Sequence, residues 1–220
     1  MRFDLISFDL DGTLVDTAGE IAEAANRAIE EFGGERQPAA VAERFIGAGG
    51  REMMRRLLER IDAAAVDVDL AYARFGFHYT SMAGTTCRLF PGVAEALRRL
   101  QAGGVRLACL TNKAEGHSRS VLRASGIDGC FDLLVGGDTL PCRKPDARVV
   151  AHIVTTLGGR PVMAHVGDSR TDVETARNAG IAAWVVPYGY NGGEPIEACH
   201  PDRVFTDLGA VADHVLRGEA

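Results

Sequence analysis

The chain has 220 residues, enough for one large domain or for a core domain with a smaller insert. Hydrophobic residues make up 46% and charged residues 25%, which is ordinary for a globular protein and excludes a disordered chain. The formal net charge of -6 argues against a nucleic-acid partner, because such proteins need a basic patch. It still permits a small anionic substrate, since a bound metal ion can reverse the local field of a site.

Short apolar segments alternate with amphipathic stretches along most of the chain. We predict five buried strands, at residues 5–8, 105–110, 133–135, 164–166 and 182–186. Amphipathic stretches between the strands end in glycine, which is typical of a helix stop, at Gly103, Gly126 and Gly180. This alternation predicts an α/β fold, with a Rossmann-like parallel sheet flanked by helices.

The alternation is interrupted between roughly residues 16 and 86, where the pattern is helical only. Thr17 and Glu20 have the spacing of a capping box, and apolar residues follow at helical spacing up to Phe32. Two further helices are indicated by apolar positions at 53–61 and 72–79. We therefore predict that residues 16–86 form a small helical cap domain inserted after the first strand. Residues 1–15 and 87–220 would form the α/β core domain.

The chain carries no sequence signal for a membrane or for secretion. No apolar run approaches the roughly 20 residues that a membrane-spanning helix needs. The N-terminal segment is too acidic and too short for a signal peptide. Its five cysteines are an odd number without a CxxC pair, which argues against a disulfide framework or a zinc site. We therefore expect a cytoplasmic protein in a reducing compartment.

Two aspartates, Asp9 and Asp11, follow the first predicted strand. Being two residues apart, they project to the same face, about 6–7 Å from each other at a rise of ~3.3 Å per residue. Two negative charges at that distance repel by roughly 2–3 kcal/mol at an effective dielectric of ~20. A hard dication is the natural counter-charge. A solvated acidic turn is the alternative that the DxDG sequence alone leaves open.

Three more polar clusters follow predicted strands or open the next helix: Thr111-Asn112-Lys113, Lys144-Pro145-Asp146 and residues 167–172. In open parallel sheets, ligands bind at the carboxyl ends of the strands, so these clusters predict a single site. Of the 24 basic residues, only two are lysines, and both lie in these clusters. A compact ammonium group is a point charge that acts where a planar guanidinium would not fit.

Together these motifs resemble the haloacid dehalogenase superfamily. DxDGT at residues 9–13, Thr111-Asn112, Lys144 before proline and GDxxxD at residues 167–172 occur in that family's order. The helical stretch resembles the cap domain that many members insert between the first two motifs. Within the superfamily, FDLDGTLVDT, LTNK, VGDSRTDVETARNAG and PYGYNGGEP are most similar to the phosphoglycolate phosphatase subgroup.

The resemblance implies a phosphomonoester hydrolase that acts on 2-phosphoglycolate through an aspartyl-phosphate intermediate. Asp9 would be the nucleophile, and Asp11 the general acid and base. Thr111 and Lys144 would bind the phosphate and stabilise its charge. Mg²⁺ would be held by Asp9, Asp168 and the backbone carbonyl of Asp11, with Asp172 a direct or water-mediated ligand.

Further substrate-binding roles are expected for Asn112 and Lys113, and Thr13 would orient Asp11. The glycine-rich segment at 47–50 reads as a cap loop near the substrate, with Arg51 as a candidate for binding the substrate's carboxylate or, equally, as a solvent-facing side chain. The six histidines have no metal-binding spacing and no plausible catalytic partner, so we expect surface or core roles for them.

Several alternatives remain open. A sugar-phosphate phosphatase, a phosphoglucomutase-like enzyme and a pyrophosphatase share all four motifs, and a non-catalytic phosphate-ligand binding protein would share the fold. A dehalogenase is disfavoured because Asp11 is present, and a phosphonatase because residues 16–86 contain no lysine. The expected partner is a small phosphorylated metabolite, with no nucleic acid and no membrane, and the chain would be a monomer or a homodimer.

Overall fold

A six-stranded parallel sheet lies at the centre of the protein, whose computed structural model describes residues 3–158 and 163–218. Its strand order is β5-β4-β1-β6-β7-β8. The strands are β1 (Leu5–Phe8), β4 (Arg106–Leu110), β5 (Leu133–Val135), β6 (Met163–Gly167), β7 (Ala182–Val185) and β8 (Arg203–Val204). The predicted α/β fold is confirmed, and the first strand lies inside the sheet, paired with β4 on one side and β6 on the other.

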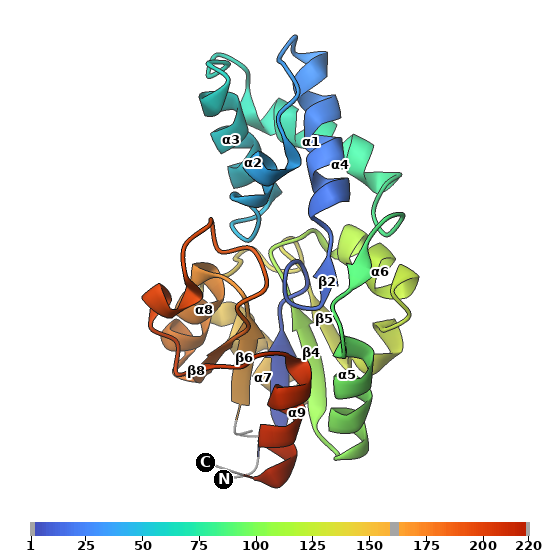
Figure 1. The fold of residues 1–220 in the computed structure, drawn as a ribbon, viewed down its shortest axis with the longest axis vertical. Helices are drawn as coiled ribbons and strands as arrows, with labels where there is room; N and C mark the ends of the chain where they lie inside the picture. The colour runs from blue at the N-terminus through green and yellow to red at the C-terminus, as the bar shows by residue number, and fades with distance from the viewer. Residues whose placement is uncertain (1–2, 159–162, 219–220) are drawn as a thin grey trace.

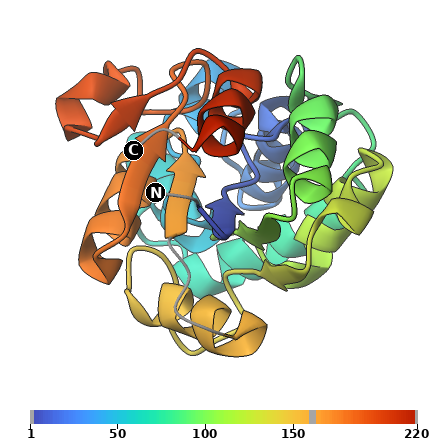
Figure 2. The ribbon, with the colours of Figure 1, turned by 90° about the horizontal axis from the view of Figure 1, so that it is seen from below.

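Helices cover both faces of this sheet (Figures 1 and 2). Helices α5 (Val93–Ala102), α6 (Glu115–Ala124) and α9 (Leu208–Arg217) share one hydrophobic cluster with Ile6 and Phe8. Helix α7 (Arg148–Leu157) packs with Leu5 in another cluster, and α8 (Arg170–Ala179) packs with alternate residues of β7. Successive strand residues point to opposite faces, which is why neighbours in β1 belong to different clusters. Short 3₁₀ turns lie at Asp128–Cys130 and Ile196–Cys199.

Four helices form a second layer over the sheet's carboxyl edge: α1 (Ala18–Glu31), α2 (Ala39–Glu43), α3 (Gly50–Arg60) and α4 (Val68–Thr80) (Figure 1). They enclose a hydrophobic cluster of their own, whose buried members run from Ile21 to Tyr79. Two short strands, β2 (Val15–Asp16) and β3 (Arg88–Leu89), pair antiparallel where the chain enters and leaves this layer. The domain boundaries at residues 16 and 86 stay a prediction.

The start of α1 differs from the expected capping box. The Thr17 hydroxyl donates to Asp11 at 2.6 Å, and the Glu20 carboxylate accepts from the Tyr79 hydroxyl at 2.7 Å. The backbone N–H groups of Thr17 and Ala18 donate to the phenol oxygen of Tyr190, at 3.1 and 3.2 Å. The prediction of a capping box is wrong, because the side chains of Thr17 and Glu20 both have other buried partners.

Among the described residues, no helix combines the length and apolar character needed to cross a membrane.

Candidate active site

The four sequence clusters meet at the carboxyl ends of three neighbouring strands. Asp9 directly follows β1, Thr111 follows β4 and Asp168 follows β6. Because β1 lies between β4 and β6, segments more than 100 residues apart in sequence reach the same edge of the sheet. The side chains of Asp9, Thr111, Lys144 and Asp168 are all buried there.

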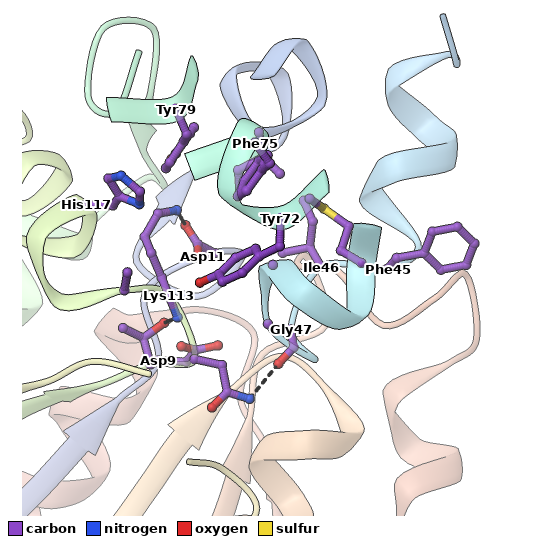
Figure 3. A pocket seen from close by; sticks show the side chains of 17 residues that line it. Asp9, Asp11, Phe45, Ile46, Gly47, Tyr72, Phe75, Tyr79, Lys113 and His117 are labelled. Carbon is purple, nitrogen blue, oxygen red and sulfur yellow. Dashed lines mark hydrogen bonds and ion pairs between the residues drawn. The ribbon is translucent and has the colours of Figure 1, made fainter. Parts of the chain in front are cut away.

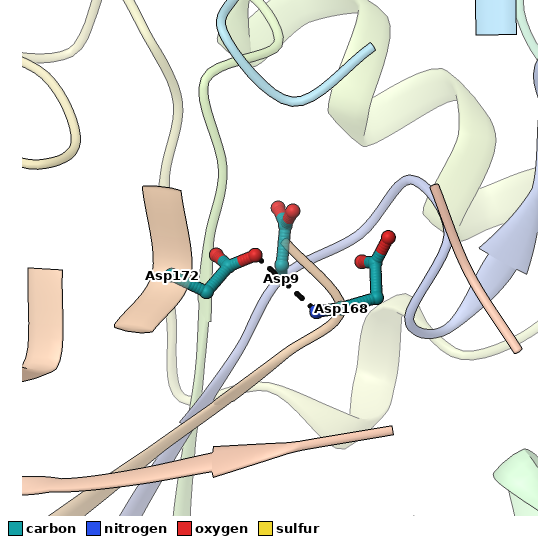
Figure 4. A group of neighbouring side chains, drawn as sticks. All are labelled: Asp9, Asp168 and Asp172. Carbon is teal, nitrogen blue, oxygen red and sulfur yellow. Dashed lines mark hydrogen bonds between the residues drawn. The ribbon is translucent and has the colours of Figure 1, made fainter. Parts of the chain in front are cut away.

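Asp9, Asp168 and Asp172 form a compact group of carboxylates (Figure 4). One oxygen atom from each lies within 4.8 Å of the others. Burial and the neighbouring carboxylates Asp172 and Asp9 raise the pKa of Asp168 well above its ordinary value. Burial also raises the pKa of Asp9, although Lys144 opposes that shift. Burial and mutual repulsion thus both disfavour the ionised forms of these carboxylates, which positive charge nearby would offset.

Lys144 supplies part of the missing charge. Its ammonium nitrogen lies 2.9 Å from Asp9 Oδ1 and 2.7 Å from Asp172 Oδ1, and all three side chains are almost inaccessible to solvent. Burial by itself would lower the pKa of Lys144, but Asp172 and Asp9 hold it above its ordinary value. Burial likewise opposes ionisation of Asp172, yet Lys144 and His165 hold the pKa of Asp172 far below its ordinary value.

Both oxygens of Asp172 are occupied by donors of the chain itself. Besides Lys144, Oδ1 is 3.0 Å from His165 Nε2. Oδ2 accepts from Ser169 Oγ at 2.6 Å and from two backbone N–H groups, those of Ser169 and Asp168. Asp172 therefore fixes Lys144 and the loop before α8, and this occupancy favours a water-mediated over a direct role at a metal ion.

His165 is a site residue that the sequence analysis missed. It lies on β6, with Nδ1 2.8 Å from the Ser7 hydroxyl and Nε2 facing Asp172. The expectation that no histidine has a partner in the site is therefore wrong for His165. The available signal was strand alternation: Ser7 and His165 are register partners on β1 and β6, just before the two motif loops.

Asp11 is held by Thr17 and by an ion pair with Lys113. The expectation that Thr13 orients Asp11 is wrong, because the Thr13 hydroxyl donates to Asp168 Oδ1 at 2.5 Å. A tight turn at Gly12, with φ +88°, directs Thr13 toward the end of β6. A Cβ atom at Gly12 would lie only 2.4 Å from Asp168 Oδ2, so this position requires glycine.

A cavity of about 50 Å³ lies over Asp9 and Asp11, between the helical layer and the sheet (Figure 3). Its sheet side includes Thr111, Asn112, Lys113 and His117. The opposite wall is mainly apolar and aromatic, formed by Ile21, Phe45, Ile46, Met53, Tyr72, Phe75 and Tyr79. The Lys113 ammonium group lies over the Tyr79 ring, 4.8 Å from its centroid. The charged groups of the cavity therefore lie on its sheet side.

Arg51 has the solvent-facing position that was one of its two predicted roles, and His117 differs from expectation. Arg51 is absent from the described lining residues, and its guanidinium pairs with Asp69 at the start of α4, with Nε 2.5 Å from Oδ1. His117, to which we gave no role in the site, does line the cavity. Burial and the charge of Lys113 lower the pKa of His117 below its ordinary value. Lys113 is thus the cationic side chain that reaches the cavity from the sheet side.

Asn112 joins the two layers beside the cavity. Its side-chain nitrogen donates to the carbonyl of Gly47 at 3.1 Å and to the carbonyl of Lys144 at 3.2 Å. The glycine-rich loop before α3 is therefore bonded to the same side chain as the backbone of Lys144, which brings the predicted cap loop against the catalytic edge of the sheet.

The comparisons with known proteins agree with this geometry. A model of the haloacid dehalogenase-like hydrolases matches residues 3–180. The chain belongs to this family. This hydrolase is 38% identical over 207 residues to the phosphoglycolate phosphatase of Nitrosospira multiformis, covering 92% of this chain and 91% of the relative. It is also 38% identical to the phosphoglycolate phosphatase of Pseudomonas putida, covering 94% and 78%.

Solved structures extend the comparison to the fold of this hydrolase. A predicted phosphoglycolate phosphatase of Haemophilus somnus superimposes with a TM-score of 0.90 at 32% identity, covering 97% of this chain and 98% of the other. CbbY of Rhodobacter sphaeroides, solved with phosphate, has the same fold at 22% identity, with a TM-score of 0.79 and coverage of 95% and 96%. The resemblance read from the motifs is confirmed.

The donor set of this hydrolase suits a hard divalent cation. Four carboxylates (Asp9, Asp11, Asp168 and Asp172) face the ammonium groups of Lys113 and Lys144, an excess of two negative charges when all are ionised. Carboxylate and carbonyl oxygens are the ligands that such ions prefer. Burial first, and then the charges of Asp172 and Asp9, raise the pKa of Asp168, and a bound cation would offset the repulsion from those two carboxylates.

Proposed function

We propose that this hydrolase is a Mg²⁺-dependent phosphomonoester hydrolase that acts on 2-phosphoglycolate through an aspartyl-phosphate intermediate. The observation that carries the proposal is the buried Asp9, which lies 2.9 Å from Lys144 within the carboxylate group and lines the cavity. The substrate is proposed because similar chains over nearly the whole length are named phosphoglycolate phosphatases.

Asp9 is poised as the nucleophile. Its Oδ1 accepts from the backbone N–H of Leu10 at 2.7 Å and from Lys144, which fixes the orientation of the carboxylate. In the first step an Asp9 oxygen attacks phosphorus while the ester P–O bond breaks, and Asp11 gives its proton to the departing alcohol oxygen. In the second step Asp11 takes a proton from water, whose oxygen attacks phosphorus and releases inorganic phosphate and free Asp9.

Asp9, Asp168 and the backbone carbonyl of Asp11 would hold Mg²⁺, and Asp172 would act on it indirectly. When bound, the ion supplies positive charge to the phosphate oxygens. Lys144 adds a second positive charge beside Asp9, and the Thr111 hydroxyl donates to the phosphate. Phosphoryl transfer depends mostly on positioning and charge stabilisation, which these side chains provide.

The cavity also bears on the substrate. Its mainly apolar far wall offers few hydrogen-bonding partners, which favours a compact ester over a sugar phosphate with many hydroxyl groups. With Arg51 paired to Asp69, Lys113 is the side chain that would receive the substrate's carboxylate. His117 would contribute as a neutral group, because its pKa is lowered.

The test is hydrolysis of 2-phosphoglycolate, a panel of sugar phosphates and pyrophosphate, each with Mg²⁺ and with chelator. We expect 2-phosphoglycolate to lead in kcat/KM by about 100-fold, which is about 2.7 kcal/mol of transition-state discrimination. D9N should abolish turnover and phosphoenzyme formation while the protein still folds. A sugar phosphate or pyrophosphate in the lead would overturn the substrate, and absence of Mg²⁺-dependent turnover would support a non-catalytic binding protein.

A further inference from the structure

Tyr190 lies in the PYGYNGGEP segment, to which the catalytic scheme above assigns no role. The residue is in the loop after β7 and is 7% exposed. Its backbone N–H donates to Asp168 Oδ2 at 2.6 Å. Its side chain extends to the point where the chain leaves the sheet layer and enters α1. One residue thus contacts both a proposed metal ligand and the start of the helical layer.

The phenol oxygen has three partners there. It accepts from the backbone N–H groups of Thr17 and Ala18, at 3.1 and 3.2 Å, and donates to Asp16 Oδ1. The first N–H groups of a helix lack partners within the helix, and leaving them unpaired in a buried place is costly. Thr17 does not cap its own helix, because its hydroxyl is bonded to Asp11. The start of α1 therefore depends on a phenol from the core, together with Asp16, whose Oδ1 also accepts from the Ala18 N–H at 3.3 Å.

The aromatic ring has little freedom to move. A Cβ atom at Gly12 would lie 2.8 Å from Tyr190 Cδ2, so the ring packs directly on the turn that follows Asp11. At Gly189, a Cβ atom would lie 2.4 Å from both Asp168 Oδ2 and the Gly12 carbonyl. Close packing of the loop on these two segments holds the phenol in place.

We propose that Tyr190 is a positioning residue, whose phenol fixes the start of α1 and thereby places the helical wall of the cavity over Asp9 and Asp11. Helix α1 carries Ile21 of that wall and packs on α4, which carries Tyr72, Phe75 and Tyr79. Burial and Asp16 raise the pKa of Tyr190, so the phenol keeps its proton at neutral pH. This role rests on the proposed hydrolysis but not on the identity of the ester.

The test compares Y190F with Y188F. Tyr188 belongs to the same loop, and its hydroxyl donates to the Thr13 carbonyl at 2.9 Å, a contact within the sheet layer. Both substitutions remove one phenol hydroxyl, but only Y190F removes a bond to the helical layer. The backbone N–H that donates to Asp168 remains in Y190F, so Mg²⁺ affinity measured by calorimetry should stay within about 2-fold of the unsubstituted protein.

Two readouts are expected to change in Y190F and not in Y188F. The ratio of kcat/KM for the best ester to that for p-nitrophenyl phosphate should fall about 10-fold, mainly through a higher KM, because the cavity wall is less well placed. Amide hydrogen exchange in a peptide covering residues 14–24 should accelerate about 10-fold, because the Thr17 N–H loses its acceptor and the Ala18 N–H keeps only the 3.3 Å bond to Asp16.

The outcomes separate this inference from the proposed function. If the unsubstituted protein hydrolyses no ester, the proposed function fails, and unchanged exchange in Y190F would then overturn the positioning role as well. If the protein is active but Y190F keeps its substrate ratio and exchange rates, the inference alone is wrong. Equal loss of activity toward all esters, or equal effects of Y188F, would indicate a general structural role and would also overturn it.

Discussion

Removal of the Asp168 charge should stabilise the metal-free protein while abolishing its activity. D168N keeps the shape of the side chain, and an amide can still meet the Thr13 hydroxyl and the Tyr190 N–H. At the 4.8 Å limit on the separations among Asp9, Asp168 and Asp172, each ionised pair repels by about 3.5 kcal/mol at a dielectric of ~20. The substitution removes two of these three pairs.

The measurable gain is smaller, because the folded protein can bind a proton at Asp168 instead of bearing the repulsion. We expect D168N to gain about 1–3 kcal/mol in free energy of unfolding at pH 7.5 without Mg²⁺. For a chain of this size that corresponds to an increase in Tm of roughly 2–10 °C. Mg²⁺ should raise the Tm of the unsubstituted protein and have little effect on D168N.

D172N is the matched control, for which we expect a lower instead of a higher free energy of unfolding. Asp172 is ionised opposite Lys144, and its pKa is lowered rather than raised. Loss of its charge leaves Asp9 as the remaining ion-pair partner of Lys144 and should lower the free energy of unfolding by about 3 kcal/mol. The two substitutions lie one helical turn apart and change the same chemical group. If both shift the metal-free Tm in the same direction, the assignment of excess negative charge to Asp168 is wrong.

The same reasoning fixes the sign of the pH dependence. The folded-state pKa of Asp168 is raised, so its favourable contribution is fully present below the unfolded value of 3.8 and is lost as pH rises through the folded pKa. The pKa of Asp172 is lowered, so its contribution is present above 3.8 and is lost as pH falls through the folded pKa. In metal-free melting curves, the stability of D168N relative to the unsubstituted protein should therefore increase as pH rises from about 4.

K113M should raise the KM for 2-phosphoglycolate by about 10-fold or more, and the KM for p-nitrophenyl phosphate much less. R51A should change both KM values by less than about 2-fold, because Arg51 forms an exposed ion pair with Asp69. Similar effects of the two variants in steady-state kinetics would contradict the assignment of Lys113 to the substrate's carboxylate. T17V should lower kcat about 10-fold with little change in KM, since Asp11 loses a 2.6 Å hydrogen bond, and unchanged kcat would remove Thr17 from the site. H165Q, whose amide nitrogen can replace Nε2, should keep kcat within about 3-fold of the unsubstituted protein, and H165L should lower kcat further. Equal kcat values for the two variants would show that the contact with Asp172 is dispensable.

The fold class and the meeting of the four motifs at one edge of the sheet could be predicted from the sequence alone. Strand periodicity located β1, β4, β5, β6 and β7, and the rule that ligands bind at the carboxyl ends of parallel strands predicted one site from four separated motifs. The pairing of β1 with β4 and β6 brings Asp9, Thr111 and Asp168 to one edge, as expected. These features are local, since they depend on the alternation of side chains and on the residues that end each strand.

Which hydroxyl donates to which carboxylate depends on how the elements pack together. Thr13 and Thr17 both follow Asp11, and no local pattern distinguishes them. The turn at Gly12 directs Thr13 to Asp168, while the Thr17 hydroxyl donates to Asp11 and the phenol of Tyr190 accepts from the Thr17 N–H. Glu20 instead accepts from Tyr79, 59 residues away in sequence, and Thr17 donates to Asp11 in the preceding turn, and these buried contacts outweighed the local capping box.

The same distinction explains Arg51 and His165. Arg51 follows a glycine-rich loop beside the cavity, but the direction of α3 sends its side chain to Asp69 on α4. For His165 the available signal was strand alternation, but its partners Ser7 and Asp172 lie on β1 and α8 and could not be named from the sequence. Sequence periodicity determines the face on which a residue lies, whereas its partner depends on how the separate elements pack in three dimensions.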